Sequence, residues 1–133
     1  MKKSILTIED SKALNYVFAT IFKPEFDVFV ANNYSEAFQY LRSGQFVDLV
    51  IINIPNDECD NFRFLAHISS SSLFYNIPTV VLSNSTDSQL RNKAKALGAS
   101  LFLNTPFDPV LLLEKAKEFV YEKESRRFIR EIQ

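Results

Sequence analysis

An acidic pair and several polar strand ends are the residues of this chain whose types could do chemistry. Glu9 and Asp10 directly follow the apolar run Ile5–Ile8. Two adjacent carboxylates repel each other, so either one of them binds a proton at a raised pKa or a cation neutralises the pair. A hard cation with oxygen ligands, such as Mg²⁺, fits such a pair best. Later apolar runs also end in polar residues, at Asn53, Ser83-Asn84 and Asn104-Thr105.

The elements that must position these residues alternate between strands and helices. Strands are predicted at Ile5–Ile8, Phe26–Ala31, Leu49–Ile52, Thr79–Leu82 and Leu101–Leu103. Helices are predicted at Leu14–Phe22, Ser35–Arg42, Phe62–Ser69, Asp87–Leu97 and from Pro109 onward. The third and fourth strands are apolar without alternation, which is typical of strands buried on both faces of a parallel sheet. This order predicts an α/β fold, a doubly wound five-stranded parallel sheet with five helices.

Two helix starts carry local signals. Thr86 followed by Gln89 matches a capping box, so we expect Thr86 to be the N-cap of its helix. Asp108-Pro109 combines an N-cap residue with proline at the first helical position.

A polar pocket is expected at one edge of this sheet. In open α/β sheets, ligands bind beyond the carboxyl ends of the strands. We therefore expect Glu9, Asp10, Asn53 and Ser83 to lie close together there. A simpler alternative is that Asp10 caps the first helix while Glu9 faces solvent.

Composition and length exclude several classes of function. The chain has 133 residues and a net charge of −1, which suits one domain and argues against direct nucleic-acid binding. One cysteine, Cys59, and one histidine, His67, are too few for a zinc site of the Cys/His type. No signal peptide is visible, and no apolar run reaches the roughly 18 residues of a membrane span. We expect a cytoplasmic protein with no membrane contact, a domain at 1–121, and a last-helix extension or flexible tail at 122–133.

The chain resembles the receiver domain of bacterial two-component response regulators, from Lys3 to about Val120. The segment Ser4–Asp10 resembles the family's first strand with its acidic pair, and Asp48–Asn53 resembles the strand that carries the phosphoacceptor. Pro78–Ser83 resembles the strand that ends in a conserved hydroxyl. Leu97-Gly98-Ala99 and then Phe102–Phe107 resemble the strand that ends in a Lys-Pro-Phe motif. The resemblance implies a flavodoxin-like fold with strand order 2-1-3-4-5.

The same resemblance assigns a metal site. In that family a histidine kinase passes a phosphoryl group to an aspartate, and Mg²⁺ assists the transfer. Glu9 and Asp10 match the metal-binding pair, and Asn53 stands at the phosphoacceptor position. The backbone carbonyl two residues after the phosphoacceptor, here that of Pro55, is a further expected ligand.

The resemblance also assigns the residues around the phosphoryl group. Ser83 matches the hydroxyl that contacts phosphoryl oxygens, and Phe102 matches the aromatic residue whose rotation reports the switch. Thr105-Pro106 matches the Lys-Pro pair, whose peptide bond is typically cis.

Departures from the family pattern fall on its most reactive positions. Asn53 replaces the aspartate, and a neutral amide is a very poor nucleophile toward phosphorus. Thr105 replaces the lysine, so the pocket keeps Glu9 and Asp10 but no fixed positive charge. Asn61 stands at a position that is usually glycine, and because asparagine tolerates a left-handed backbone we expect it to preserve the turn. The chain therefore looks like an atypical pseudo-receiver that binds Mg²⁺ weakly.

Three functions from different classes remain open. The first is a non-enzymatic binding module that signals through protein contacts without phosphorylation at Asn53. Its expected partners are a histidine kinase, an output protein, another regulator or a second copy of the chain. In the second, a receiver still accepts a phosphoryl group in the presence of Mg²⁺ at another residue, Asp57 or Asp60. The third is a flavodoxin-like cofactor binder, which the lack of a phosphate-binding loop disfavours.

The expected contact surface is a family-level implication. It comprises the helix Asp87–Leu97, the strand at Phe102 and the last helix, and it would also serve a homodimer. No output domain follows in this sequence, so we expect output through a partner or a dimer.

Overall fold

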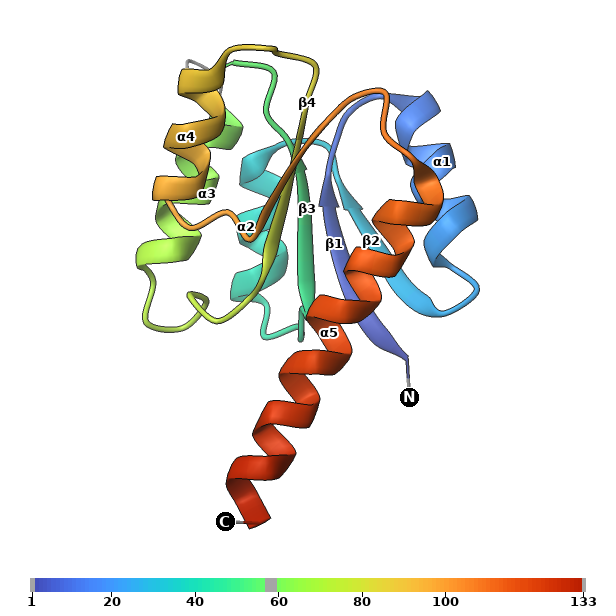
Figure 1. Cartoon of the computed structure of the whole chain (residues 1–133), viewed down its shortest axis with the longest axis vertical. Coiled ribbons are helices and arrows are strands. Elements are labelled where there is room, and N and C mark those ends of the chain that lie inside the picture. The colour runs from blue at the N-terminus through green and yellow to red at the C-terminus, as the bar shows by residue number, and fades with distance from the viewer. Residues whose placement is uncertain (1, 57–59, 133) are drawn as a thin grey trace.

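A central sheet of parallel strands organises the fold (Figure 1). In this computed structural model, which describes residues 2–56 and 60–132, five strands lie in the order β2-β1-β3-β4-β5. Their bounds are β1 Lys3–Ile8, β2 Phe26–Ala31, β3 Leu49–Asn53, β4 Thr79–Ser83 and β5 Leu101–Asn104. All neighbouring pairs are parallel, which confirms the predicted doubly wound α/β fold and its strand order.

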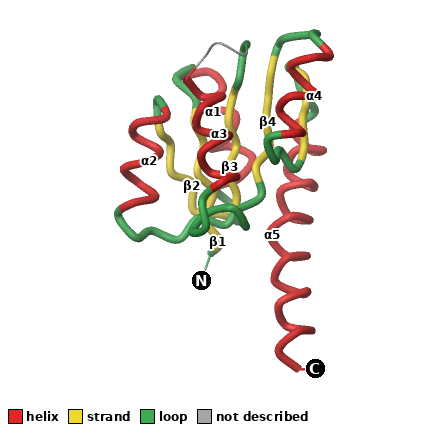
Figure 2. Tube along the Cα trace, turned by 90° about the vertical axis from the view of Figure 1, so that its left-hand side faces the viewer, coloured by secondary structure: helices red, strands yellow, loops and turns green. Residues whose placement is uncertain are grey.

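Helices cover both faces of the sheet. On one face lie α1 (Lys12–Phe22) and α5 (Pro109–Ile132), and on the other lie α2 (Tyr34–Arg42), α3 (Asp60–Ser70) and α4 (Ser88–Ala96) (Figures 1 and 2). The carboxyl-terminal half of α5 extends past the amino ends of the strands. None of the helices in the described part of the chain is long and apolar enough to span a membrane.

The apolar core is divided into two layers by the sheet. Alternate residues of β3 point to opposite faces, so Val50 and Ile52 pack with α2, α3 and α4, while Leu49 and Ile51 pack with α1 and α5. Strand β4 does the same with Val81 on one face and the pair Val80 and Leu82 on the other. This two-sided burial explains why the two central strands lack the alternation of polar and apolar residues.

The N-cap of α4 differs from the one expected from the sequence. Helix α4 begins after Asp87, whose carboxylate accepts a hydrogen bond from the backbone N–H of Gln89 at 2.9 Å. Thr86 is therefore not the N-cap, because an aspartate one residue later offers a stronger acceptor for the free amides of the first turn. At α5, the carboxylate of Asp108 accepts from Val110 N–H at 2.9 Å, as predicted.

A tight contact joins α3 to the turn after α4. Gly98 has a φ of +108°, the left-handed region that favours glycine. A Cβ added at Gly98 would lie 2.8 Å from Cβ of Ser69 in α3, so the turn and the helix leave no room for a side chain. Glycine at this position therefore serves both the backbone conformation and the packing.

Some sequence expectations fall outside the described residues or stay untested. Asp57 and Cys59 lie outside them, between the end of β3 and α3. The domain boundary at 121 stays a prediction, and the backbone of α5 is helical across it, from Pro109 to Ile132.

Candidate functional site

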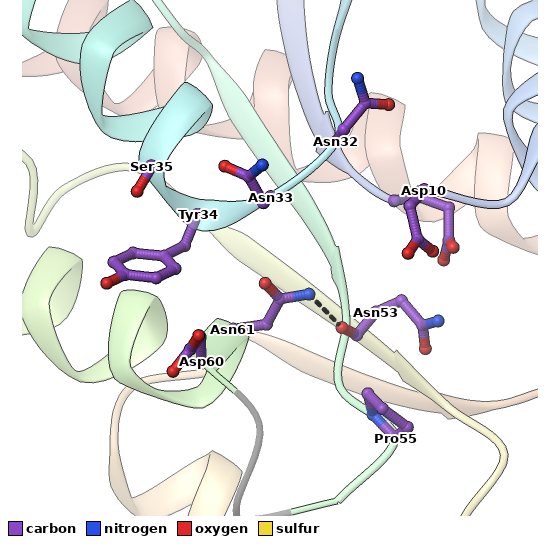
Figure 3. A pocket seen from close by; sticks show the side chains of 10 residues that line it. Asp10, Asn32, Asn33, Tyr34, Ser35, Asn53, Pro55, Asp60 and Asn61 are labelled. Atoms are coloured by element: carbon purple, nitrogen blue, oxygen red, sulfur yellow. Dashed lines mark hydrogen bonds between the residues drawn. The ribbon is translucent and has the colours of Figure 1, made fainter.

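A pocket of about 580 Å³ lies at the carboxyl ends of β1 and β3, between the start of α2 and the start of α3 (Figure 3). Oxygen-bearing side chains dominate its lining, and lysine, arginine and histidine do not occur among the described residues that form it. The lining residues are Glu9, Asp10, Asn32, Asn33, Tyr34, Ser35, Asn53, Pro55, Asp60 and Asn61.

Glu9 is the buried member of the acidic pair, with only 3% of its surface exposed. Its Oε1 atom accepts a hydrogen bond from the backbone N–H of Ser11 at 2.9 Å. Its Oε2 atom is buried and has no hydrogen-bond partner among the described residues. Asp10, next in sequence, is exposed at the pocket wall.

The start of α1 rules out the simpler interpretation of this pair. Ser11, not Asp10, is the N-cap, and its hydroxyl accepts from the backbone N–H of Leu14 at 3.3 Å. The side-chain amide of Asn15 donates to the backbone carbonyl of Glu9 at 2.8 Å and ties the helix to the strand end. Glu9 therefore faces the protein interior, and the alternative that places it in solvent is wrong.

Burial sets the protonation of Glu9. Desolvation raises the pKa of its carboxyl group above the ordinary value, because a charge in low dielectric loses its hydration. The Ser11 N–H and the Asn53 side chain lower the pKa in part, and the negative charge of Asp10 raises it again. Ionisation of Glu9 is therefore less favourable than that of an exposed carboxyl group, and a nearby cation would offset this cost.

Asn53 is the last residue of β3, and Asn61 of α3, across the pocket, holds it in place. Its backbone carbonyl accepts a hydrogen bond from the side-chain amide of Asn61 at 2.8 Å (Figure 3). Asn61 lies within α3, and glycines alone have positive φ in the described part of the chain. The expectation of a left-handed turn at Asn61 is therefore wrong, because this residue fixes the loop through its side chain instead.

The predicted metal ligands share this pocket. Glu9, Asp10, Asn53 and Pro55 all line it. The described residues hold no group of three or more His, Cys, Asp or Glu side chains that would form a metal site by themselves. An unpartnered, buried carboxylate oxygen beside further oxygen donors nevertheless fits a hard cation, which would supply the charge that Glu9 lacks.

The residues assigned to the phosphoryl group lie apart from this lining. Ser83 is fully buried, and its hydroxyl accepts from the backbone N–H of Ser85 at 3.1 Å. Thr105 donates its backbone N–H to the carbonyl of Ser83 at 2.9 Å, and the Thr105-Pro106 peptide bond is cis, as expected. Phe102 is 4% exposed, with the guanidinium of Arg91 5.8 Å from its ring centroid.

Sequence reasoning missed the wall formed by the loop after β2 and the first turn of α2. Asn32, Asn33, Tyr34 and Ser35 line the pocket. Strand β2 is the neighbour of β1 and runs parallel to it, so the residues that follow it reach the same edge of the sheet. The polar run after Ala31 was the signal that could have identified them.

Comparison with known proteins gives the family. Residues 5–117 match the response regulator receiver domain. The chain belongs to that family. It is thus a receiver domain of two-component signalling, a class that typically binds Mg²⁺ and interacts with histidine kinases and other signalling proteins.

Individual relatives are distant. The chain is 24% identical over 130 residues to hybrid signal transduction histidine kinase D of Dictyostelium discoideum, covering 98% of this chain and 8% of that protein. It is 32% identical over 85 residues to response regulator Rre1 of Synechocystis, covering 64% of this chain and 36% of that protein. The chain therefore spans only a minor part of the length of these curated relatives.

Solved structures share the fold. A CheY-like receiver domain protein from Methanospirillum hungatei superposes with a TM-score of 0.83 at 21% identity, covering 95% of this chain and 99% of that one. A response regulator from Thermotoga maritima gives a TM-score of 0.79 at 24% identity, with 91% and 99% covered.

Proposed function

We propose that this receiver domain signals through protein contacts and is not phosphorylated at Asn53. The observation that carries the proposal is the amide of Asn53 at the end of β3, in a pocket lined also by Glu9 and Asp10. An amide lacks the nucleophilic oxygen anion that attacks a phosphoryl group. The scaffold is that of a receiver, but the group that would accept the phosphoryl is missing.

The charge of the pocket supports the same proposal. Phosphoryl transfer depends on cations that neutralise the oxygens of the transferred group. Thr105 stands where the family has lysine, and no cationic side chain is found in the described lining of the pocket. An incoming phosphoryl group would meet Glu9 and Asp10 with no fixed positive charge to balance it.

Weak Mg²⁺ binding is part of the proposal. Glu9 and Asp10 would supply carboxylate oxygens, and Asn53 and Pro55 would supply an amide oxygen and a backbone carbonyl. A bound Mg²⁺ would supply the positive charge that stabilises an ionised Glu9. Loss of the family's third carboxylate lowers the expected affinity.

The proposed partners are other signalling proteins: a histidine kinase, an output protein or another regulator. The proposed contact surface comprises α4, β5 and α5, and a homodimer through these elements is included. Support comes from family membership and from α4, which buries only Leu90 and Ala94 and leaves its other side chains at or near the surface.

Intact-mass measurement after incubation with acetyl phosphate and Mg²⁺ tests the proposal. We expect the wild-type mass to stay unchanged. The matched control is the variant that combines Asn53→Asp with Thr105→Lys, which rebuilds the family's nucleophile and cation and should gain one phosphoryl group. Phosphorylation of an aspartate in the wild type would overturn the proposal.

The position of Asp60 supports a second candidate function, a receiver that is phosphorylated at a residue other than Asn53. Asp60 lines the same pocket as Asn53 and is exposed, so it is a carboxylate within the site. If the wild type gains a phosphoryl group and Asp60→Asn abolishes the gain, the chain is a Mg²⁺-dependent receiver with a displaced acceptor. If the gain survives in Asp60→Asn, Asp60 is not the acceptor, and the same measurement on Asp57→Asn tests the other candidate.

A further inference from the structure

The side chain of Asn104 joins two strands and a loop. Asn104 is the last residue of β5 and pairs with Ser83, the last residue of β4. Its Nδ2 atom donates to the backbone carbonyl of Ser85 at 2.6 Å and to that of Ser83 at 3.2 Å. An amide NH₂ group has two hydrogens, so both of its donors are used on the backbone of one short segment.

A series of hydrogen bonds continues from this point to α4. The backbone N–H of Ser85 donates to Ser83 Oγ at 3.1 Å, and that of Asp87 donates to Ser85 Oγ at 3.1 Å. The carboxylate of Asp87 then accepts from Gln89 N–H at 2.9 Å and caps α4. Consecutive hydrogen bonds thereby connect the end of β5 to the first turn of α4.

The loop between β4 and α4, residues 84–87, has little else to hold it. Asn84, Thr86 and Asp87 are exposed, and Ser85 is half-buried, so the loop places no apolar side chain in the core. A segment without apolar anchors opens locally unless hydrogen bonds prevent it. Among the described residues outside the loop, Asn104 is the one whose side chain bonds to a loop carbonyl, that of Ser85, and it also bonds to the carbonyl of Ser83 at the end of β4.

We propose that Asn104 is a built-in latch, which holds the loop 84–87 and the start of α4 in one conformation without a ligand or phosphoryl group. This inference deepens the proposed function and rests on its premise that signalling needs no phosphorylation. The latch keeps the surface around α4 in the same conformation at all times.

The position of α4 depends on this latch for a second reason. Helix α4 inserts only Leu90 and Ala94 into the core, and Arg91 covers the ring of the buried Phe102 at 5.8 Å. A shift at the start of α4 would therefore move Arg91 away from Phe102. Asn104 is a positioning residue for the surface that α4 and Phe102 form.

Hydrogen exchange of the whole chain, followed by mass spectrometry, tests the latch. Asn104→Ala removes both donors, and Asn104→Asp keeps the shape but turns a carboxylate oxygen toward two carbonyl oxygens. In both variants we expect peptides that cover residues 84–89 to exchange faster by about tenfold, as the loss of one or two hydrogen bonds allows. Peptides from β1, β3 and α1 should be unchanged.

The matched control is Asn92→Ala, which deletes the same side chain from an exposed position on α4. It should leave the exchange of residues 84–89 at the wild-type rate. If Asn104→Ala does not fold, the shape-conserving Asn104→Asp variant carries the test.

Two outcomes would overturn the latch. One is an exchange rate of residues 84–89 equal to that of the wild type in the Asn104 variants. The other is an equal acceleration in every peptide, which would show that Asn104 contributes only to global stability. A separate experiment adds phosphodonor and Mg²⁺ to the wild type. A gain in mass together with altered exchange at residues 84–89 would contradict the proposed function. The comparison of the Asn104 variants with the wild type uses no phosphodonor, so its result does not depend on the proposed function.

Discussion

At the scale of single residues, the main feature of the pocket is the carboxyl group of Glu9, which is buried although one of its oxygens lacks a hydrogen-bond partner among the described residues. Glu9 is 3% exposed, with one oxygen bonded to Ser11 and the other without a partner among the described residues. Burial of an unpaired charge costs several kcal/mol, on the order of the desolvation of one ion, so proteins neutralise such groups. Here binding of a proton or a cation would remove that cost.

The contribution of Glu9 to the stability of the protein should consequently fall as the pH rises in metal-free buffer. Because burial raises the pKa of Glu9, the folded state binds more protons than the unfolded state between the ordinary and the raised value. In that window the free energy of unfolding decreases with increasing pH. Glu9→Gln cannot ionise, so we expect it to exceed the wild type by on the order of 1 kcal/mol at neutral pH.

Urea unfolding in EDTA, from about pH 4 to about pH 8, measures this difference. The two proteins should approach each other toward the acidic end, where Glu9 is protonated in the folded state and largely protonated in the unfolded state. Glu114→Gln, on an exposed part of α5, is the control and should follow the wild type. A wild type that gains stability relative to Glu9→Gln as the pH rises would contradict the prediction.

At the scale of the elements, short polar side chains fix the loops where the strands end. Asn61 holds the loop after β3 by a bond of 2.8 Å to the carbonyl of Asn53, and Asn104 holds the loop after β4. At the opposite edge of the sheet, glycine has the corresponding role, because Gly98 lets the turn after α4 approach Ser69 of α3. These single contacts therefore add to the core packing that positions α3 and α4.

The two glycines of the chain provide a matched test of this packing. Both have positive φ, but a Cβ at Gly44 would meet nothing within 4 Å, whereas one at Gly98 would meet Ser69 Cβ at 2.8 Å. Gly44→Ala should cost about 1 kcal/mol of unfolding free energy from backbone strain alone, and Gly98→Ala should cost at least about 1 kcal/mol more.

Denaturant unfolding of both variants measures the difference, and a double-mutant cycle with Ser69→Gly assigns its cause. The cycle should show a favourable coupling, because removal of the Ser69 side chain makes room for the new Cβ. Equal costs for Gly44→Ala and Gly98→Ala would show that backbone strain, and not the contact with α3, decides the effect.

At the scale of the whole molecule, the pocket unites segments that are far apart in sequence. Its walls come from the end of β1, the loop after β2, the end of β3 and the start of α3. The parallel sheet brings these segments to one edge, with an apolar core on each face behind them. A ligand of this pocket would therefore bind the folded state and not the unfolded chain.

Mg²⁺ should stabilise the whole fold through this linkage. A ligand at about ten times its Kd adds about 1.4 kcal/mol to the free energy of unfolding, which raises Tm by roughly 2–6 °C for a domain of this size. Differential scanning calorimetry over a Mg²⁺ series at constant ionic strength measures the shift. Asp10→Asn should reduce it, and Asn53→Asp, which adds a carboxylate, should produce it at lower concentrations. No shift up to tens of millimolar Mg²⁺ would exclude a retained metal site.

The sequence by itself determined the strands, the helices and the sheet. The unbroken apolar runs of β3 and β4 predict two-sided burial, and the strict alternation of strands and helices predicts a parallel sheet. These patterns are local and repeated, so a single misplaced residue does not change them. The same holds for the cap at Asp108, because its partner Val110 lies on the same turn.

Only the tertiary structure decided which polar residues meet. Thr86 and Asp87 are both cap residues in sequence, and in the structure Asp87 is the N-cap, with its backbone N–H donating to Ser85 Oγ and its carboxylate accepting from Gln89 N–H. Glu9 and Asp10 are adjacent carboxylates that line the same pocket, but Glu9 is buried and Asp10 is exposed. Ser83 hydrogen-bonds to its own loop, while Asn61 and the loop after β2 enter the pocket. The pocket joins segments that lie far apart along the chain, and a pattern of local spacing holds no information about their distance in space.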